Sequence, residues 1–379
     1  MPTEVLILGA GFGGLELATR LSEEVPEEVH VTLVDQNEWF AFGFSKLDVM
    51  FGRLPAEGIR LYYRDIVKPS VAFKHEQVQS IDSRARRVVT SGGTYEADVL
   101  VVALGADLDP AATPGLGEGG YEFYSFAGAE RVRNVLAAFD GGDVVISVLG
   151  GFFKCPPAPN EAALMLDGYL RARGIRDRST IRLLTPLPMP IPISRTTSDQ
   201  IVAALEARGI EHWPGSLVTH LDPPNKSAHV ADGRSVSYDL FLAVPIHRAP
   251  AVVQESGMTV DGWVPVDPVT FETPFPNVFA VGDVTSAPVP RAGVIAEGEA
   301  GTVADVLVSR IRAGGAEPEP YAGDAVCYIE MGDGTVARVD VRFLRGPQPT
   351  AVFQPPSLEI SDQKRQFAAT RRRRWFGVE

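Results

Sequence analysis

The sequence is poor in cysteine, with only Cys155 and Cys327 in 379 residues. Two cysteines cannot supply the disulfide framework of a small secreted protein. The six histidines show no spacing typical of metal ligands, so we expect no metal site. No apolar run reaches the roughly 18 residues of a membrane-spanning helix, and the first residues lack the pattern of a secretory signal. These absences predict a cytoplasmic protein without a bound metal.

Positive charge is also scarce, because the formal net charge is -13. This charge argues against a nucleic-acid partner, since the phosphate backbone is anionic. The exception is a run of four arginines, Arg371, Arg372, Arg373 and Arg374, followed by Trp375 and Phe376. Such a run favours weak contact with an anionic membrane surface. A solvated charged face is the alternative, so we expect at most peripheral attachment on the inner face of the membrane.

Glycines at a nucleotide-binding spacing lie near the start of the chain. Residues 5–8 predict a buried strand and residues 15–21 a helix, and between them Gly9, Gly11 and Gly14 match G-x-G-x-x-G, with Phe12 inside the turn. A second predicted strand, residues 29–35, ends in Asp35. Such glycines let the backbone approach a pyrophosphate, and the acid accepts hydrogen bonds from ribose hydroxyls. The pattern predicts a dinucleotide site; a glycine turn that only packs helix on strand is the alternative.

A second strand–turn–helix unit has a turn of different chemistry. Residues 144–149 predict a buried strand, and a helix is expected from residue 162. The turn between them contains Gly150, Gly151, Phe152 and Phe153, then Cys155 among three prolines. It has no G-x-G-x-x-G spacing, and its two bulky phenylalanines would obstruct a pyrophosphate. We therefore expect that neither NADH nor NADPH reduces the protein efficiently.

The order of these units predicts an α/β fold. It comprises two Rossmann-like dinucleotide-binding domains, the first of them discontinuous, and a small C-terminal α+β segment. The expected boundaries are 1–108 with 260–315 for the first domain, 109–259 for the second and 316–379 for the last segment. Residues 313–320 are expected to be a linker, residues 325–331 and 335–343 two strands, and residues 357–376 a helix. The sequence leaves a homodimer open.

Three motifs occur in the order found in one superfamily. The glycine turn, Ala103-Leu104-Gly105 and residues 279–283, which end in Gly282-Asp283, resemble the FAD motifs of flavoproteins with two dinucleotide-binding domains. Residues 154–161, residues 325–328 around Cys327, and residues 290–297, which include Arg291 and Gly293, resemble the sulfide:quinone oxidoreductase and flavocytochrome c sulfide dehydrogenase branch. The resemblance implies an FAD cofactor whose ribityl chain is held by Asp283.

The resemblance also implies a chemistry for the cysteines. In that branch two cysteines beside the flavin form a redox-active pair, which here would place Cys327 facing the flavin and a persulfide on Cys155. Two inert buried cysteines are the alternative from composition alone. Glu161 is the candidate general base, and a helix N-terminal carboxylate is its alternative role. Arg291 stands where the branch has a lysine. A helix that opens within residues 292–299 is expected to point its N-terminus at the flavin, where Arg291 would add positive charge; a surface role is the alternative for Arg291. No cysteine occurs in residues 39–46, where some relatives attach FAD covalently, so non-covalent FAD is expected.

The implied activity is oxidation of sulfide, a persulfide or another small sulfur compound, with a quinone as electron acceptor. The residues expected to line an apolar quinone pocket are Phe343, Phe353, Trp375 and Phe376, and a place in the core is the alternative for each of them. Two alternatives remain at this point. One is a soluble flavoprotein that donates electrons to a protein partner such as a cytochrome. The other is a flavoprotein that senses redox state without catalysis.

Overall fold

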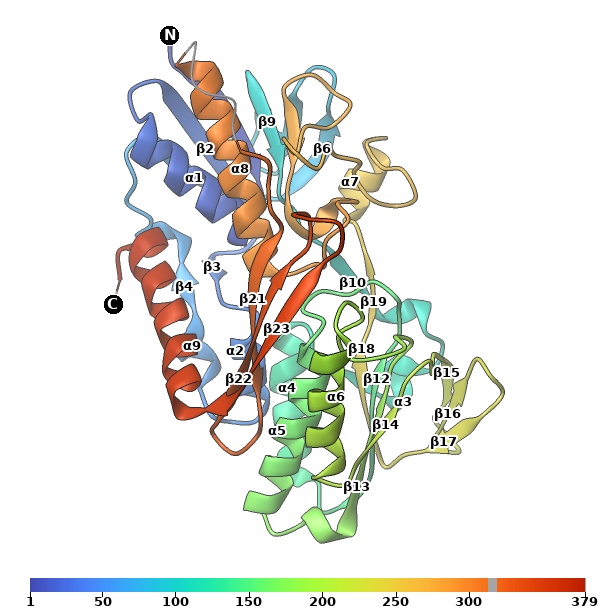
Figure 1. Ribbon diagram of the computed structural model, residues 1–379. Coiled ribbons are helices and arrows are strands. Elements are labelled where there is room, and N and C mark those ends of the chain that lie inside the picture. Colours follow the sequence, from blue (N-terminus) through green and yellow to red (C-terminus); the bar gives the residue numbers. More distant parts are fainter. Residues whose placement is uncertain (313–318, 379) are drawn as a thin grey trace.

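The computed structural model describes residues 1–312 and 319–378 and contains two five-stranded parallel sheets (Figure 1). The first sheet has the order β20-β9-β1-β2-β5, and all its neighbouring strands are parallel. Its strands are apolar and rich in β-branched residues, as is typical of a parallel sheet covered on both faces. They are β1 (Thr3–Leu8), β2 (Val29–Asp35), β5 (Val71–His75), β9 (Val99–Val102) and β20 (Val278–Ala280).

Helices α1 (Phe12–Glu24) and α8 (Gly293–Ile311) lie side by side over one face of this sheet (Figure 1). The other face is covered by an antiparallel sheet of β6 (Val78–Asp82), β7 (Arg87–Thr90) and β8 (Thr94–Glu96), and by α7 (Ala251–Glu255). The helix expected over 15–21 is thus confirmed, and it begins at Phe12, directly after the glycine turn.

The second sheet has the order β11-β18-β12-β13-β14 and is also parallel throughout. Helices α4 (Phe126–Ala138), α5 (Ala158–Ala172) and α6 (Arg195–Glu206) pack on one face, and the antiparallel strands β15 (Val218–Asp222), β16 (Ser227–Val230) and β17 (Ser235–Ser237) pack on the other. The strands of the sheet are β11 (Tyr121–Glu122), β12 (Gly142–Val148), β13 (Ser179–Leu184), β14 (Ile210–Trp213) and β18 (Leu240–Val244).

The start of α5 differs from the sequence prediction. The helix begins at Ala158, not at residue 162, and includes Pro159 in its first turn. Proline is tolerated there because the first helical N–H groups have no partner inside the helix. The earlier start places Glu161 within the first turn of α5.

The C-terminal segment forms an antiparallel sheet and a helix. Strands β21 (Asp324–Glu330), β22 (Val336–Arg342) and β23 (Thr350–Ser357) precede α9 (Leu358–Arg371) and one π-helical turn, Arg372–Phe376. The sequence did not predict β23, which contains Pro355 and Pro356; it is an edge strand, where proline is tolerated. Short elements join the parts: β3 (Trp39–Phe40), α2 (Ser45–Met50), β4 (Leu61–Tyr62), β10 (Asp107–Asp109), α3 (Leu116–Gly119) and β19 (Ile246–Arg248).

These sheets confirm the predicted fold class. The two five-stranded sheets and the C-terminal sheet β21-β22-β23 each take all their strands from one of the three predicted residue ranges. The domain boundaries themselves stay predictions. The boundary at residue 315 and most of the expected linker 313–320 lie outside the described residues. Over residues 1–312 and 319–378, no helix has both the length and the apolar content needed to cross a bilayer.

Two arginines of the run, Arg371 and Arg374, are docked against the first domain, whereas Arg373 is exposed. Arg374 donates to Glu16 (2.6 Å), and Arg371 forms a two-bond pair with Glu297. Trp375 and Phe376 are buried, with 1% and 4% of their surface exposed. The prediction that this segment contacts a membrane surface is therefore wrong for Trp375 and Phe376, because both side chains belong to the core.

Candidate active site

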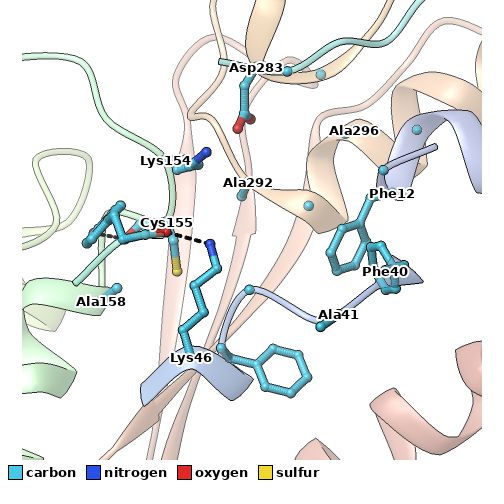
Figure 2. A pocket seen from close by; sticks show the side chains of 18 of the residues that line it. Phe12, Phe40, Ala41, Lys46, Lys154, Cys155, Ala158, Asp283, Ala292 and Ala296 are labelled. Carbon is cyan, nitrogen blue, oxygen red and sulfur yellow. Dashed lines mark hydrogen bonds between the residues drawn. The ribbon is translucent and has the colours of Figure 1, made fainter. Parts of the chain in front are cut away.

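A cavity of about 240 Å³, cavity A, is lined by residues that follow strands of both parallel sheets (Figure 2). The first sheet supplies the turn after β1, the end of β9, and Asp283 after β20. The second sheet supplies Cys155 from the turn after β12. The crevice at the carboxyl ends of parallel strands is the usual ligand site of such folds. The predicted residues on its wall are Gly11, Phe12, Ala103, Gly105, Cys155, Glu161, Gly282, Asp283 and Gly293.

A second cavity of about 500 Å³, cavity B, adjoins cavity A and shares Gly11, Ala103 and Gly105 with it. Gly9 and Asp35 lie on its wall. The Asp35 carboxylate accepts the Ala10 N–H at 2.7 Å, so it also fixes the glycine turn. Together the two cavities connect the predicted ribose acid, Asp35, to the predicted ribityl acid, Asp283.

The glycine turn is built as a nucleotide site requires. A Cβ on Gly14 would lie 1.9 Å from the Gly9 carbonyl oxygen, so this glycine is needed for packing inside the turn. A Cβ on Gly11 would meet nothing within 4 Å, and Gly11 faces both cavities. The position thus leaves room for a ligand to approach the backbone. These contacts, and two adjoining cavities with Asp283 on the wall of one and Asp35 on the wall of the other, fit a dinucleotide cofactor of the FAD type.

The N-terminus of α8 opens on cavity A, as the sequence predicted. Gly293 begins the helix, and a Cβ there would lie 2.5 Å from the Phe12 ring. A helix N-terminus favours negative charge, because its first N–H groups have no partner inside the helix. Behind it, buried Glu299 accepts the Gly282 N–H, and burial raises the pKa of Glu299 to about 8. Glu299 thereby fixes the loop that carries Asp283.

Cys155 is held on the wall of cavity A in an unusual backbone conformation. Its φ is +56°, in the left-handed region that favours glycine. Its N–H donates to the Arg291 carbonyl (2.7 Å), and its own carbonyl accepts from the Ala158 N–H (2.9 Å). Such a conformation costs on the order of 1–3 kcal/mol and persists only where the surroundings enforce it. The two backbone hydrogen bonds therefore hold Cys155 in a conformation that glycine adopts most readily.

Cys327 lies on β21 and lines a third cavity of about 500 Å³, cavity C. The wall of this cavity is mainly apolar and includes Phe152, Ile191, Val339 and Phe343. Both cysteines are free thiols that pack against the same core cluster. Cys155 therefore faces cavity A and Cys327 faces cavity C, the reverse of the orientation that the resemblance implied.

Burial and a neighbouring acid control the protonation of both thiols. Burial and the Glu161 carboxylate raise the pKa of Cys327 to about 12 and also raise the pKa of Cys155. Glu161 itself is 2% exposed and accepts the Glu330 N–H at 3.1 Å. Burial raises the pKa of Glu161 to about 7. The structure thus brings the three predicted catalytic residues together, and a thiolate there requires a nearby proton acceptor.

Arg291 and Lys154 lie beside the loop of Asp283. The Arg291 Nε donates to the Asp283 carbonyl (2.9 Å), and its guanidinium stacks 3.7 Å from the centre of the Trp263 ring. Arg291 lines cavity C, whereas the sequence argument expected its charge beside the flavin. Lys154 points between Cys155 and Asp283 (Figure 2). Burial raises the pKa of Asp283, and the charge of Lys154 opposes part of that effect.

Two lysines of the site were not predicted from the sequence. Lys46 rises from α2 toward Cys155 (Figure 2) and donates to the Tyr124 carbonyl at 2.6 Å. Burial, together with Lys154, lowers the pKa of Lys46 to about 7. Lys364 on α9 is buried beside Glu161. A lone lysine in the aromatic stretch 39–51 was a usable signal for Lys46, but Lys364 stands in a polar stretch that offered none.

The aromatic residues expected to line a quinone site are not gathered in one place. Phe343 lines cavity C, and Phe353 is partly buried against the core cluster around α5. Trp375 packs against Phe12 with the ring centres 5.5 Å apart, and Phe376 is buried in the same cluster. The predicted four-ring pocket is therefore not present in this form.

Comparisons with known proteins agree with this geometry. The model of the pyridine nucleotide-disulphide oxidoreductase family matches residues 3–300. The mitochondrial sulfide:quinone oxidoreductase of Mus musculus is 25% identical over 382 residues, covering 94% of this chain and 82% of that protein. The type II NADH:quinone oxidoreductase of Staphylococcus aureus is 24% identical, covering 96% of this chain and 98% of that protein.

Among solved structures, the sulfide:quinone oxidoreductase from Aquifex aeolicus superposes with a TM-score of 0.85 and 24% identity. The match covers 97% of this chain and 90% of that chain. At this identity the likeness concerns the fold, and it agrees with the two parallel sheets and the C-terminal segment described above.

Proposed function

The chain belongs to the pyridine nucleotide-disulphide oxidoreductase family, and we propose that it is an FAD-dependent oxidoreductase of the sulfide:quinone type. In this proposal Cys155 and Cys327 oxidise sulfide, a persulfide or another small thiol. The observation that carries the proposal is the position of Cys155 on the wall of cavity A, beside the dinucleotide motifs. A sulfur atom there can exchange electrons with a bound flavin, whereas the equivalent turn of a nicotinamide-binding domain would hold a nucleotide.

The cofactor is proposed to be non-covalent FAD. Gly9, Gly11 and the start of α1 would hold the pyrophosphate, and Asp35 the adenosine ribose. Ala103, Gly105, Gly282 and Asp283 would hold the ribityl chain, and the N-terminus of α8 at Gly293 would face the ring. When bound, the flavin supplies a two-electron acceptor next to the cysteine pair.

The sulfur chemistry follows thiol–disulfide exchange. HS⁻ attacks one sulfur of an oxidised Cys155–Cys327 pair, which breaks the S–S bond, forms a persulfide on that cysteine and frees the other as a thiolate. A second sulfide or thiol removes the outer sulfur of the persulfide. The two cysteines then re-form their disulfide and give two electrons to the flavin. Because Cys327 faces the apolar cavity C, we assign it to the incoming sulfur compound and Cys155 to the flavin side.

The donor is proposed to be sulfur and not a nicotinamide, although the relatives include a type II NADH:quinone oxidoreductase. Phe153 is buried in the turn after β12 and Phe152 flanks it, where a dinucleotide would need close backbone approach. The electron acceptor is proposed to be a quinone, with an electron-accepting protein as the alternative.

An anaerobic titration of the purified yellow protein tests the proposal. Sulfide is expected to bleach the flavin absorbance, and a soluble quinone is expected to restore it. Reduction by NADH at the same rate, or a flavin that no sulfur compound reduces, would contradict the assigned donor. Reoxidation by a cytochrome but not by the quinone would replace the acceptor and leave the donor assignment intact.

A further inference from the structure

A cluster of buried charged side chains lies behind the cysteine pair, where α5, β21 and α9 meet. Lys364 Nζ is 2.8 Å from Glu330 Oε1 and 3.9 Å from Glu161 Oε1. Glu161 Oε1 also accepts the Glu330 N–H at 3.1 Å. On the outer side, Arg53 Nη1 lies 2.9 Å from Glu330 Oε2 and 3.9 Å from Asp48 Oδ1. The five side chains form one connected group that reaches from the thiols toward solvent.

The charges of this group do not balance when all of them are ionised. Three carboxylates, Glu161, Glu330 and Asp48, face two cations, Lys364 and Arg53. The sum is one negative charge in excess, and an unbalanced buried charge is costly unless a proton neutralises it. Glu330 contacts both cations at 2.9 Å or less, whereas Glu161 and Asp48 each lie 3.9 Å from a single cation. Of these two, Glu161 is the more deeply buried, with 2% of its side chain exposed against 20% for Asp48. When all five groups are ionised, a proton that the cluster takes up therefore goes to Glu161.

We infer that this cluster is the proton store of the site. Glu161 accepts the proton of a thiol or persulfide in the cysteine pair, and Lys364 is the positioning residue that keeps Glu161 able to accept it. The sulfur step rests on the function proposed above. The transfer converts –SH and –COO⁻ into –S⁻ and –COOH, and it needs no further reactant.

The position of Lys364 explains why α9 contributes to a site formed mostly by other elements. Lys364 is buried, which by itself would lower its pKa, yet that pKa is raised, because the carboxylates of Glu161 and Glu330 favour its charged form. Its ammonium also lies 5.2 Å from the centre of the Phe44 ring, on the wall of cavity A. The lysine charge opposes the effect of burial on Glu161, since a nearby cation lowers the pKa of a carboxyl group.

Several groups act on Glu161 from the elements packed around it. Glu330 and Asp48 raise its pKa, and Lys364 and the Glu330 N–H lower it. Both cysteine thiols and the Tyr124 hydroxyl respond to the Glu161 charge. The charged and titratable groups facing Glu161 are thus Asp48 on α2, Tyr124 before α4, Cys155 in the turn before α5, Cys327 and Glu330 on β21, and Lys364 on α9.

Two substitutions should move the titration of Glu161 in opposite directions. In Lys364→Met the cation is lost, so Glu161 stays protonated to a pH about one to three units higher. In Glu330→Gln a neighbouring negative charge is lost while the shape and one of the two side-chain hydrogen bonds can remain, so Glu161 ionises at lower pH. Lys364→Arg should retain the wild-type midpoint within about half a unit. Lys226→Met removes a lysine that pairs with Asp239 away from the site, and serves as the control.

The measurement is the infrared carbonyl band of protonated Glu161, followed against pH in the FAD-loaded protein and identified by its loss in Glu161→Gln. The pH midpoint of sulfide-dependent flavin reduction should move with this band. A merely structural role for Lys364 would lower both rates and stability without opposite shifts in the two variants. If Lys364→Met does not fold, Glu330→Gln and Lys364→Arg still decide the matter. The inference would be overturned if the pH midpoint of the band were unchanged in Glu330→Gln. It would also be overturned if the pH midpoint of flavin reduction did not shift together with the band.

If sulfide does not reduce the flavin at all, the proposed function fails on its own. The proton store is then judged by the pH dependence of alkylation of Cys155 and Cys327 by iodoacetamide, read by mass spectrometry. Alkylation midpoints that follow the infrared band support the store without the sulfide activity. Alkylation that is unaffected by Glu330→Gln would exclude it.

Discussion

The two helices that follow the central turns, α1 and α5, place a buried glutamate at nearly the same point but surround it differently. Glu16 on α1 receives Arg374 Nη1 at 2.6 and 2.7 Å and the Trp375 indole N–H at 2.9 Å. Glu161 on α5 receives one backbone N–H at 3.1 Å, and its lysine partner is 3.9 Å away. Both cations come from the same C-terminal segment.

The same strand–turn–helix architecture thus gives Glu16 in the first domain a structural role and Glu161 in the second domain a role in proton transfer. Charged donors at short distance satisfy the carboxylate of Glu16, so it ties the tail to the first domain. The sparse donors around Glu161 leave burial as the stronger effect, and its pKa rises to about 7. The turns before these two helices also differ. The turn after β1 offers its backbone to a cofactor, whereas the turn after β12 offers the sulfur of Cys155.

The largest effect is expected when the sulfur atoms of the second turn and its partner strand are replaced. Cys155→Ser and Cys327→Ser should each lower sulfide-dependent flavin reduction by at least about 10³-fold, because the nucleophile and its partner act as a unit. Bound FAD should remain, as judged by the visible spectrum. Retention of wild-type flavin reduction by either variant would show that the second turn does not carry the chemistry.

The two glutamates provide a matched pair for the next test. At a fixed concentration of HS⁻, Glu161→Gln should slow sulfide-dependent reduction by about 10²-fold and remove the inflection near pH 7, because the amide cannot accept a proton. Rates of the wild-type enzyme should rise with pH through that region, since Glu161 is protonated below its pKa of about 7 and ionised above it. Stopped-flow measurements from pH 5.5 to 8.5 would record both effects.

Glu16→Gln should behave in the opposite way. It should lower the free energy of unfolding by about 1–2 kcal/mol, because a charge-assisted bond to a half-exposed arginine is lost, and leave the pH inflection in place. Urea unfolding followed by tryptophan fluorescence would measure the change. A pH profile altered by Glu16→Gln would mean that the two glutamates are not distinct in role.

The two turns can also be compared by adding one methyl group to each. A Cβ at Gly11 or at Gly151 meets no atom within 4 Å, so both alanine variants should fold. Gly11→Ala should weaken FAD binding by at least about tenfold, because its methyl group would occupy the approach of the pyrophosphate. Gly151→Ala should retain FAD. Equal FAD content after purification would contradict the assignment of the first turn to the cofactor.

The smallest expected effect concerns Phe152. Its side chain is 70% exposed, so Phe152→Ala should change the free energy of unfolding by no more than about 0.5 kcal/mol. NADH should still fail to reduce the flavin, since Phe153 and the prolines continue to fill the turn. Rapid reduction of this variant by NADH would show that one side chain had masked a nicotinamide site.

The fold was largely predictable because local patterns carry it. Apolar β-branched runs such as residues 99–102 became buried strands, and the glycine spacing placed the first turn and Asp35 correctly. The start of α5 was missed because three prolines suggested a loop, although the first helical turn accepts proline. Edge strand β23 was missed for the same reason.

The site was only partly predictable because much of it depends on distant packing. Sequence motifs brought Cys155, Cys327 and Asp283 into consideration, but not the cavity that each cysteine faces. Lys364 lies 203 residues after Glu161 in a stretch whose polarity suggests a solvated helix. Only the packing of α9 against β22 and β23 shows that this lysine is buried. Trp375 and Phe376 were missed as core residues for a similar reason, since the neighbouring arginines suggested a surface segment, whereas two of those arginines form ion pairs with the first domain.

The contact between Arg374 and Glu16 has a consequence for the order in which the molecule forms. The two residues are 358 positions apart, so the first helix of the chain reaches its final packing only after Arg374 has been synthesised. Closing so long a loop is slow compared with local pairing, and it favours late completion of the first domain. Until then Glu16, Phe12 and the face of α1 that receives Trp375 stay exposed to water. Assembly of the flavin-binding half is thereby coupled to completion of the polypeptide.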